Sequence, residues 1–471
     1  IDERSSAFFA LGLSKSTKTP VVVISTSGTA PANFFPTVIE ASLSRVPLII
    51  LSADRPHHLI GTGENQAINQ QKLYGSHVRY FKDAGLPTEN LDLLEEILQK
   101  AMNHSNGSDW QDPPGPVHLN VPFDLPLLPD IIQTIEIPQF SFNSFKRIEK
   151  NAANIPVLEQ AAKPLIVAGP MEENRHQEDI IRFAEKIQAP ILADPLSQIR
   201  YGYQHELITA HYDHYLKLVD IHPDIIIRFG RKPTSNILCR LLEEWKQKTF
   251  LVDEWIRFND DCPNFIQAPI VAFCQNQINK TGWKGKSEWK NLLLSFEGEI
   301  DRLILSETGY SEATIARVCH ESLEEGDQLI IGNSMPIRDV DMFTSVSGLK
   351  IDTYSNRGAS GIDGVISTAL GISAMNNDRK SLLLIGDLSF YHDMNGLLAS
   401  KYEMNLTIVV INNRGGGIFS FLPIVDAGIE KFKQYWTADT GLNFKKVAEL
   451  YHCQYIKTDN LEELRVSIQE S

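Results

Sequence analysis

The sequence predicts an α/β protein of three doubly wound domains, each built on a parallel sheet. Short apolar runs typical of buried strands alternate with helical stretches along the chain. Several of these runs end abruptly in glycine and small polar residues, as strands do where open parallel sheets bind ligands. With 471 residues, the chain has the length of about three ordinary domains.

We expect the first domain to span residues 1–129 and to open with an Ala-rich helix. Its predicted strands are residues 21–25, 48–52 and 117–121. Residues 130–144 are rich in Ile, Pro, Gln and Phe without clear periodicity, so we expect a linker laid over the surface.

Two further domains are predicted after this linker. The central domain, residues 145–300, has predicted strands at 164–168, 190–193, 224–229 and 249–252. No Gly-x-Gly-x-x-Gly follows any of these strands, which argues against a bound dinucleotide. The third domain, residues 311–471, has predicted strands at 328–332, 381–386 and 406–411.

Composition excludes some classes of partner. The net charge of −15 argues against nucleic acid or an anionic membrane, because both require basic surface. No apolar run approaches the length of a spanning helix, so no membrane insertion is expected. The five cysteines form no Cys-x-x-Cys pair and are expected to be reduced thiols of a cytoplasmic protein.

The third domain carries the oxygen ligands that a divalent cation requires. Asp387 and Asn413, 26 positions apart, each follow a buried-type strand, and Gly415 adds a backbone carbonyl. One right-handed crossover separates the two strands, so both ligands are expected at the same sheet edge. Mg²⁺ bound by one carboxylate, an amide and a carbonyl keeps room for a diphosphate and water. Taken alone, the segment at Asp387 or the segment at Asn413 is also a common sequence where a strand ends in a turn in α/β proteins.

This pair resembles the signature of thiamine-diphosphate-dependent enzymes, a Gly-Asp followed one crossover later by Asn-Asn. Leu388 stands where the usual third residue is Gly. The resemblance implies three domains of the thiamine-diphosphate enzyme type, with Mg²⁺ or Mn²⁺ beside the cofactor. Its expected cofactor contacts here are Gly386, Asp387, Leu388, Ser389 and Asn413.

Such enzymes also need a Glu that bonds the aminopyrimidine ring of the cofactor. Glu3 lies at the N-terminal end of the first predicted helix, before the predicted strand 21–25 and the turn 26–29. This layout is similar to the pyrimidine-binding half of such enzymes and gives Glu3 the catalytic role. Without the metal-binding motif, the preferred interpretation of Glu3 would be a first-turn acid favoured by the helix dipole.

Further motifs narrow the resemblance to one family. They are residues 26–33, 52–56, 64–68, 332–339 and 355–364. Together they closely resemble the 2-succinyl-5-enolpyruvyl-6-hydroxy-3-cyclohexene-1-carboxylate synthases of menaquinone biosynthesis. The resemblance implies decarboxylation of 2-oxoglutarate and addition of the succinyl carbanion equivalent to isochorismate. It also implies a homodimer or homotetramer with the active site between subunits.

The family pattern assigns further residues. Substrate binding is expected at Arg55, Gln66, Ser334, Arg338, Arg357, Ile418 and Phe419. The arginines match substrate carboxylates, although an arbitrary Arg is more often a surface ion-pair residue. Asn333 and Ser334 are expected at the diphosphate, and Ile362 as the residue that keeps the cofactor bent. His118, within a strand, is interpreted as a structural residue.

The sequence also departs from the family pattern. A first βα unit, on the order of 30 residues or more, and the final strand are expected to be absent. Thr234, Ser235 and Asn236 stand where the family tends to place a basic residue. Two alternatives therefore stay open: another thiamine-diphosphate 2-oxoacid synthase or decarboxylase, and a catalytically silent chain that only binds cofactor.

Overall fold

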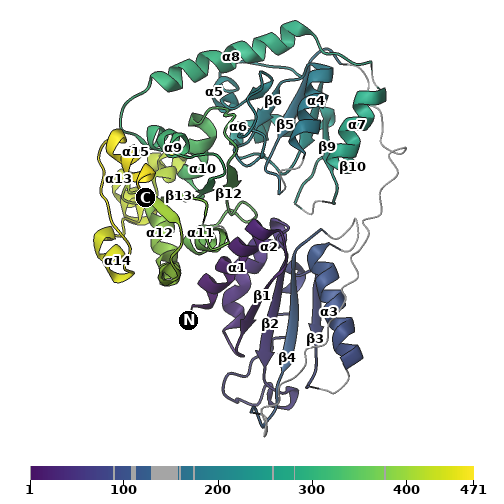
Figure 1. Cartoon of the computed structure of the whole chain (residues 1–471), viewed down its shortest axis with the longest axis vertical. Helices are drawn as coiled ribbons and strands as arrows, with labels where there is room; N and C mark the ends of the chain where they lie inside the picture. The colour runs from purple at the N-terminus through teal and green to yellow at the C-terminus, as the bar shows by residue number, and fades with distance from the viewer. Residues whose placement is uncertain are drawn as a thin grey trace. The chain divides into compact units, whose positions relative to one another are not determined.

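The computed structural model describes residues 2–87, 91–107, 113–128, 158, 161–172, 176–256, 259–280, 282–375 and 378–471. They fall into two compact units (Figure 1). Unit 1 comprises the described residues within 1–148, 356–376 and 393–404, and unit 2 comprises the others. The predicted linker, residues 130–144, lies outside the described residues.

The first sheet belongs to unit 1 and has the order β1-β2-β4-β3. Its strands are β1 (Val21–Ser25), β2 (Leu48–Asp54), β3 (Tyr80–Asp83) and β4 (Pro116–Pro122). The helices α1 (Glu3–Thr17) and α2 (Phe35–Leu43) pack on one face, against Leu48 and Ile50. The helix α3 (Leu91–Asn106) packs on the other face, against Ile49. Successive residues of β2 thus point to opposite apolar layers, as in a strand buried on both faces.

The second sheet belongs to unit 2 and has the order β10-β9-β8-β5-β6-β7. Its strands are β5 (Pro164–Ala168), β6 (Ile191–Ala193), β7 (Ile208–Thr209), β8 (Ile225–Phe229), β9 (Thr249–Asp253) and β10 (Asn264–Gln267). One layer contains α4 (Gln177–Ile187) and α7 (Ile270–Lys280). The opposite layer contains α5 (Tyr212–Tyr215), α6 (Asn236–Glu244) and α8 (Ser287–Ser306).

The third sheet, also in unit 2, has the order β12-β11-β13-β14. Its strands are β11 (Gln328–Ile331), β12 (Asp352–Tyr354), β13 (Ser381–Gly386) and β14 (Leu406–Ile411). Residues of α9 (Glu312–Glu321), α10 (Met335–Phe343) and α15 (Leu461–Gln469) share one apolar cluster with β11 and β13. The remaining helices around this part of the chain are α12 (Asp387–Asp393), α13 (Ile429–Phe432) and α14 (Phe444–Leu450).

Within unit 1, α11 (Val365–Ser373) packs directly on α1. Glycines make this approach possible. A Cβ on Gly12 would collide with the carbonyl oxygen of Thr368, and one on Gly371 with the carbonyl oxygen of Phe9. Since α1 carries Glu3 and α11 follows the segment with Arg357, two parts of the predicted site share one packed body.

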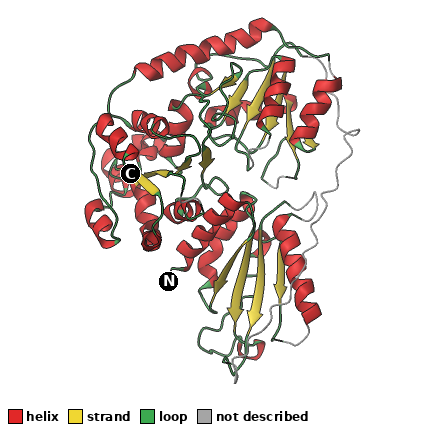
Figure 2. Cartoon of the chain, viewed as in Figure 1, coloured by secondary structure: helices red, strands yellow, loops and turns green. Residues whose placement is uncertain are grey.

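All neighbouring strands of the three sheets run parallel, which confirms the predicted fold class (Figure 2). Each predicted strand is present within two residues of its expected bounds. The structure adds β3, β7, β10 and β12, which lie at sheet edges and are missing from the sequence prediction.

Candidate active site

The predicted metal ligands lie at the carboxyl edge of the third sheet. β13 and β14 pair in parallel register, with Gly386 opposite Ile411. Asp387 therefore follows one strand where Asn412 and Asn413 follow its neighbour. The expected meeting of these two loops is confirmed.

The Asp387 carboxylate is oriented by backbone groups of both loops. Its Oδ1 accepts the N–H of Leu388 at 2.8 Å, and its Oδ2 accepts the N–H of Gly415 at 2.8 Å. The residue is only 4% exposed. Burial raises the pKa of Asp387, while the N–H groups of Leu388, Gly415 and Arg414 act in the opposite direction.

The loop after β14 places the exposed Asn413 beside Glu312. The side-chain Nδ2 of Asn413 donates to Glu312 Oε1 at 2.9 Å, which turns its Oδ1 away from that acid. Gly415 has a φ of +126°, and a Cβ there would collide with the carbonyl oxygen of Thr437. Its own carbonyl accepts the N–H of Gly417 at 2.8 Å. Only glycine fits at position 415.

These residues fit a divalent cation and a diphosphate. They supply one carboxylate, one amide oxygen and one backbone carbonyl, the donor set that Mg²⁺ shares with phosphates. A Cβ built on Gly386 would contact no heavy atom within 4 Å, so the end of β13 faces open space. Leu388 and Ser389 follow Asp387 in the first turn of α12.

The turn between β11 and α10 brings Asn333, Ser334 and Arg338 to the same edge of the sheet. Asn333 is 2% exposed. Ser334 has a φ of +72° and a ψ of −123°, a conformation that costs a non-glycine residue free energy and often marks functional sites. Arg338 Nη1 donates to the carbonyl oxygen of Ser334 at 2.5 Å, so the arginine folds over this turn.

Asp339 is a residue at this edge to which the sequence analysis gives no role. Its side chain is buried, and Oδ2 has no hydrogen-bond partner among the described residues. Burial, with a contribution from Glu312, raises the pKa of Asp339 to about 8. A buried carboxyl without partners is not visible in a sequence, because burial depends on tertiary packing.

The first-domain candidates belong to unit 1. Glu3 lies in the first turn of α1, and the side chain of Asp2 caps this helix by accepting the N–H of Ser5 at 3.2 Å. Arg55 follows β2, and its Nε donates to the carbonyl oxygen of Asn65 at 3.2 Å. Gln66 therefore comes next to the residue that Arg55 contacts.

Gln66 packs against the turn that follows β1. Its φ is +54°, and a Cβ on Gly28 would lie 3.3 Å from the Gln66 Cβ. Gln70, to which the sequence analysis gives no role, accepts the N–H of Gly28 with Oε1 at 2.9 Å. Its Nε2 donates to Asn120 Oδ1 at 2.9 Å, and both side chains are fully buried. Gln70 and Asn120 thus tie the candidate turns to the sheet.

His118, interpreted from the sequence as a structural residue, lies inside the first sheet. It is fully buried in β4, and its Nε2 lies 2.7 Å from Ser52 Oγ. The rings of Tyr74 and Phe81 contact the imidazole. Burial lowers the pKa of His118 to about 4.

The remaining candidates lie in two loops. Arg357 and Ile362 belong to the segment between β12 and α11, in the same unit as Glu3, and Ile362 is 37% exposed. Ile418 and Phe419 form part of the short 3₁₀ helix Gly417–Phe421 after β14 and are half-buried. The two residues thus follow the predicted metal ligands in unit 2.

The departure at residues 234–236 has a structural account. The N–H of Thr234 donates to Asp194 Oδ2 at 2.7 Å, and Ser235 caps α6 by accepting the N–H of Leu238 at 3.1 Å. Ser235 Oγ also donates to Asp213. This stretch therefore serves as a buried helix cap in the described structure.

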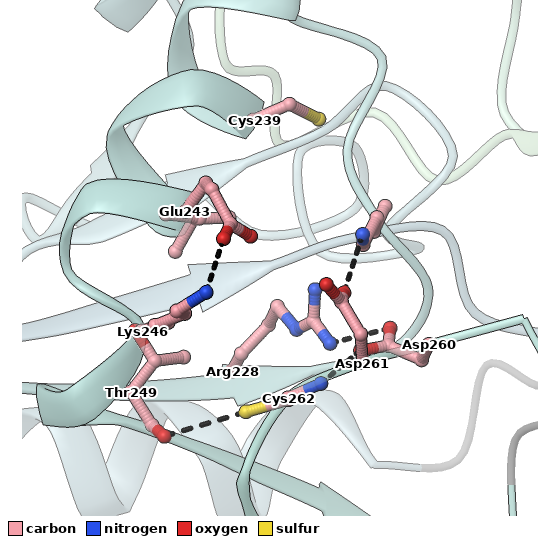
Figure 3. A pocket seen from close by; sticks show the side chains of 10 residues that line it. Arg228, Cys239, Glu243, Lys246, Thr249, Asp260, Asp261 and Cys262 are labelled. Carbon is pink, nitrogen blue, oxygen red and sulfur yellow. Dashed lines mark hydrogen bonds and ion pairs between the residues drawn. The ribbon is translucent and has the colours of Figure 1, made fainter.

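A separate pocket lies in the central part of unit 2 (Figure 3). Its charged residues pair with one another: Arg228 with Asp260 at 2.5 Å, Lys232 with Asp261 at 2.7 Å, and Lys246 with Glu243 at 2.5 Å. The charges of this pocket are thus compensated within it.

Comparison with known proteins identifies all three regions. Residues 1–73 match the N-terminal TPP binding domain of thiamine pyrophosphate enzymes, residues 146–331 the middle domain, and residues 349–471 the C-terminal TPP binding domain.

Two similar curated proteins carry the same name. The 2-succinyl-5-enolpyruvyl-6-hydroxy-3-cyclohexene-1-carboxylate synthase of Bacillus pumilus (strain SAFR-032) is 40% identical over 495 residues, covering 98% of this chain and 83% of the relative. The synthase of Listeria innocua is 40% identical over 506 residues, covering 100% of this chain and 84% of the relative. The chain belongs to this synthase family.

Membership of the synthase family agrees with the resemblance inferred from the motifs, and the two TPP binding domains identify thiamine diphosphate as the cofactor. A solved benzoylformate decarboxylase from Polynucleobacter necessarius has the same fold, with a TM-score of 0.69 at 17% identity. The matched region covers 100% of this chain and 88% of the decarboxylase chain. Among the described residues, no helix combines the length and the apolar character needed to cross a bilayer.

Proposed function

We propose that this chain decarboxylates 2-oxoglutarate and transfers the remaining four-carbon acyl unit to isochorismate. The product is 2-succinyl-5-enolpyruvyl-6-hydroxy-3-cyclohexene-1-carboxylate, in menaquinone biosynthesis. The observation that carries this proposal is the identity of about 40% with synthases of that name over nearly the whole chain. The ligand set at the edge of the third sheet supports it.

Unit 2 supplies the proposed cofactor anchor. Asp387, Asn413 and the Gly415 carbonyl hold Mg²⁺ or Mn²⁺ in this proposal. The diphosphate contacts are Asn333, Ser334, Gly386, Leu388 and Ser389. When bound, thiamine diphosphate supplies the carbon nucleophile and accepts the electron pair that departing CO₂ leaves behind.

Unit 1 supplies the proposed acid–base group. Glu3, in the first turn of α1, hydrogen-bonds the ring nitrogen of the aminopyrimidine and moves a proton at that atom. Ile362 would pack against the cofactor and help to hold it in place. Fixing these groups before substrate arrives lowers the entropic cost of the reaction.

Three arginines bind the carboxylates of the substrates in this proposal. Arg55, Arg338 and Arg357 each present a planar fork that matches a carboxylate. Gln66 and Ser334 add neutral hydrogen bonds. Ile418 and Phe419 exclude water from the reacting carbon, which strengthens the electrostatic interactions around it. The smallest proposed active unit is a homodimer with the site between subunits, and a homotetramer repeats it.

The choice of substrates tests the proposal. The chain, with thiamine diphosphate and Mg²⁺, is expected to consume isochorismate with 2-oxoglutarate as donor and not with pyruvate. Product mass would be measured by mass spectrometry. A preference for pyruvate would make the chain a different 2-oxoacid enzyme. Tight cofactor binding without turnover on either donor would make it catalytically silent.

A further inference from the structure

The segment between β12 and α11 carries Arg357 and Ile362, yet it has neither helix nor strand before Val365. A loop that binds substrate must be held in place, because freezing it at the moment of binding costs conformational entropy. Its backbone N–H groups therefore need identified partners. Two of these N–H groups donate hydrogen bonds to one buried carboxylate.

That carboxylate is Glu40, in the middle of α2 and only 2% exposed. Its Oε1 accepts the N–H of Gly358 at 2.9 Å, and its Oε2 accepts the N–H of Ala359 at 2.7 Å. The hydroxyl of Ser44, one turn along α2, donates to Oε1 at 2.6 Å. Both oxygens are thus used as acceptors, and two of the donors are the residues directly after Arg357.

A second charged group completes the arrangement. Lys15, on α1 and 8% exposed, places its Nζ 3.6 Å from Glu40 Oε1. The same Nζ donates to Asn356 Oδ1 at 2.8 Å, and Asn356 Nδ2 donates to Thr368 Oγ1 at 3.0 Å. All these groups are buried, so the residue before Arg357 is bound as firmly as the two after it.

The fit at Gly358 shows how closely the loop approaches α2. A Cβ at this position would lie 2.6 Å from Ser44 Oγ and 2.7 Å from the Glu40 carbonyl oxygen. Both distances are too short for a carbon atom. The two N–H groups therefore meet Glu40 only because position 358 lacks a side chain.

We propose that Glu40 and Lys15 are positioning residues, which hold the segment 356–359 so that Arg357 can bind a substrate carboxylate. Glu40 binds the backbone on one side of Arg357, and Lys15 binds Asn356 on the other. The inference rests on the proposed function only in giving Arg357 its substrate. Neither residue touches substrate or cofactor in this role.

A purely structural reading treats the pair as a buried ion pair that only stabilises unit 1. Removing one partner of such a pair destabilises a protein, because it leaves a buried charge uncompensated. Removing both partners relieves that penalty. The positioning role differs in one respect: a Gln at position 40 has one acceptor oxygen where the loop needs two.

The experiment compares Glu40→Gln, Lys15→Met/Glu40→Gln and Ser44→Ala in the chain of 471 residues. Ser44→Ala is the matched control, because this hydroxyl donates to the same carboxylate and its removal leaves both Glu40 oxygens available to Gly358 and Ala359. Three quantities are measured: thermal stability, KM and kcat for both substrates, and hydrogen–deuterium exchange of the peptide around residues 356–361.

The double variant is expected to recover stability relative to Glu40→Gln, since it has no uncompensated buried charge. Its KM for at least one substrate is nevertheless expected to rise about tenfold, more than kcat falls, as loss of binding contacts predicts. The amides around Gly358 and Ala359 are expected to exchange faster. Ser44→Ala is expected to keep the wild-type KM and exchange.

A double variant with wild-type KM and wild-type exchange would overturn the inference, even if Glu40→Gln alone fails to fold. Loop exchange that rises equally in Ser44→Ala would also overturn it. If the wild-type chain shows no turnover, the proposed function fails on its own, while the exchange comparison still decides whether Glu40 holds the loop.

Discussion

At the scale of single residues, the Asp387 carboxylate is oriented by N–H groups from the two loops that it joins. Leu388 and Gly415 each donate at 2.8 Å, and Gly415 has a left-handed φ of +126°. The sequence predicted Asp387 and Asn413 because strand ends and oxygen ligands are local patterns. It gave no role to Glu312, which orients the Asn413 amide across about a hundred residues, because such partners depend on packing.

The substitution Asp387→Asn is expected to weaken binding of thiamine diphosphate with Mg²⁺ by at least about tenfold, because it removes the only proposed anionic protein ligand of the cation. Isothermal titration calorimetry measures this directly. Asp220→Asn is the control, since its side chain is 88% exposed and far from the proposed ligands in sequence. Equal affinities in both variants would remove Asp387 from the metal site.

His118 is expected to make stability depend on pH. Burial lowers its pKa to about 4, from the ordinary value of 6.5 that applies in the unfolded chain. Between pH 6.5 and pH 4, His118 is mostly protonated in the unfolded chain and mostly neutral in the folded chain. Its contribution is therefore complete above pH 6.5 and is lost towards pH 4, by up to about 3 kcal/mol.

Denaturant unfolding at pH 7.5 and pH 5 measures this dependence. The variant His118→Gln is expected to lose less free energy of unfolding between the two pH values than the wild type. His222→Gln, whose side chain is 64% exposed, is expected to keep the wild-type difference. Identical pH dependence in His118→Gln and the wild type would contradict the assignment of a neutral buried imidazole.

At the scale of helices and strands, the four strands that the sequence analysis did not predict have similar positions in their sheets. β3, β7, β10 and β12 lie at sheet edges. They are two to four residues long, and β3, β10 and β12 contain polar residues that are partly exposed. Such strands lack the continuous apolar run that marks a central strand of a parallel sheet. The strands β1 and β14 also lie at sheet edges, but they were predictable because each contains a continuous apolar run.

The contact between α1 and α11 was also beyond the sequence, because it depends on two glycines far apart along the chain. Gly12→Ala is expected to lower the free energy of unfolding by about 1–3 kcal/mol, since its methyl group collides with the Thr368 carbonyl. Thermal and denaturant unfolding measure the change.

Gly298→Ala is the control for this contact. Gly298 lies in the long helix α8, and a Cβ there would meet no heavy atom within 4 Å. Alanine is expected to leave stability unchanged or to raise it by up to about 1 kcal/mol, through helix propensity alone. Equal losses in both variants would show that the close approach of α1 and α11 contributes nothing special.

At the scale of the whole molecule, the residues with proposed roles occur in both units. Glu3, Arg55, Gln66, Arg357 and Ile362 belong to unit 1, and the proposed metal and diphosphate contacts belong to unit 2. The sequence assigned these residues through family motifs, which mark the loops. It gave no role to the buried residues behind the loops, such as Glu40, Gln70 and Asn120, because their contacts join segments far apart in sequence.

The proposed active site between subunits can be tested by complementation. Glu3→Gln and Asp387→Asn are each expected to be inactive as homodimers. In a mixed dimer, one of the two sites then keeps both native residues, so co-expressed chains isolated through two different tags are expected to regain activity. A mixed dimer without activity would mean that Glu3 and Asp387 of the same chain act together.

The most direct test of the central claim is CO₂ release from 2-oxoglutarate, with thiamine diphosphate and Mg²⁺, in the presence and absence of isochorismate. The wild-type chain is expected to release CO₂ and to form the adduct only when isochorismate is added, and Glu3→Gln is expected to do neither at a comparable rate. Two results would contradict the account: equal rates of CO₂ release with and without isochorismate, or a Glu3→Gln variant as active as the wild type.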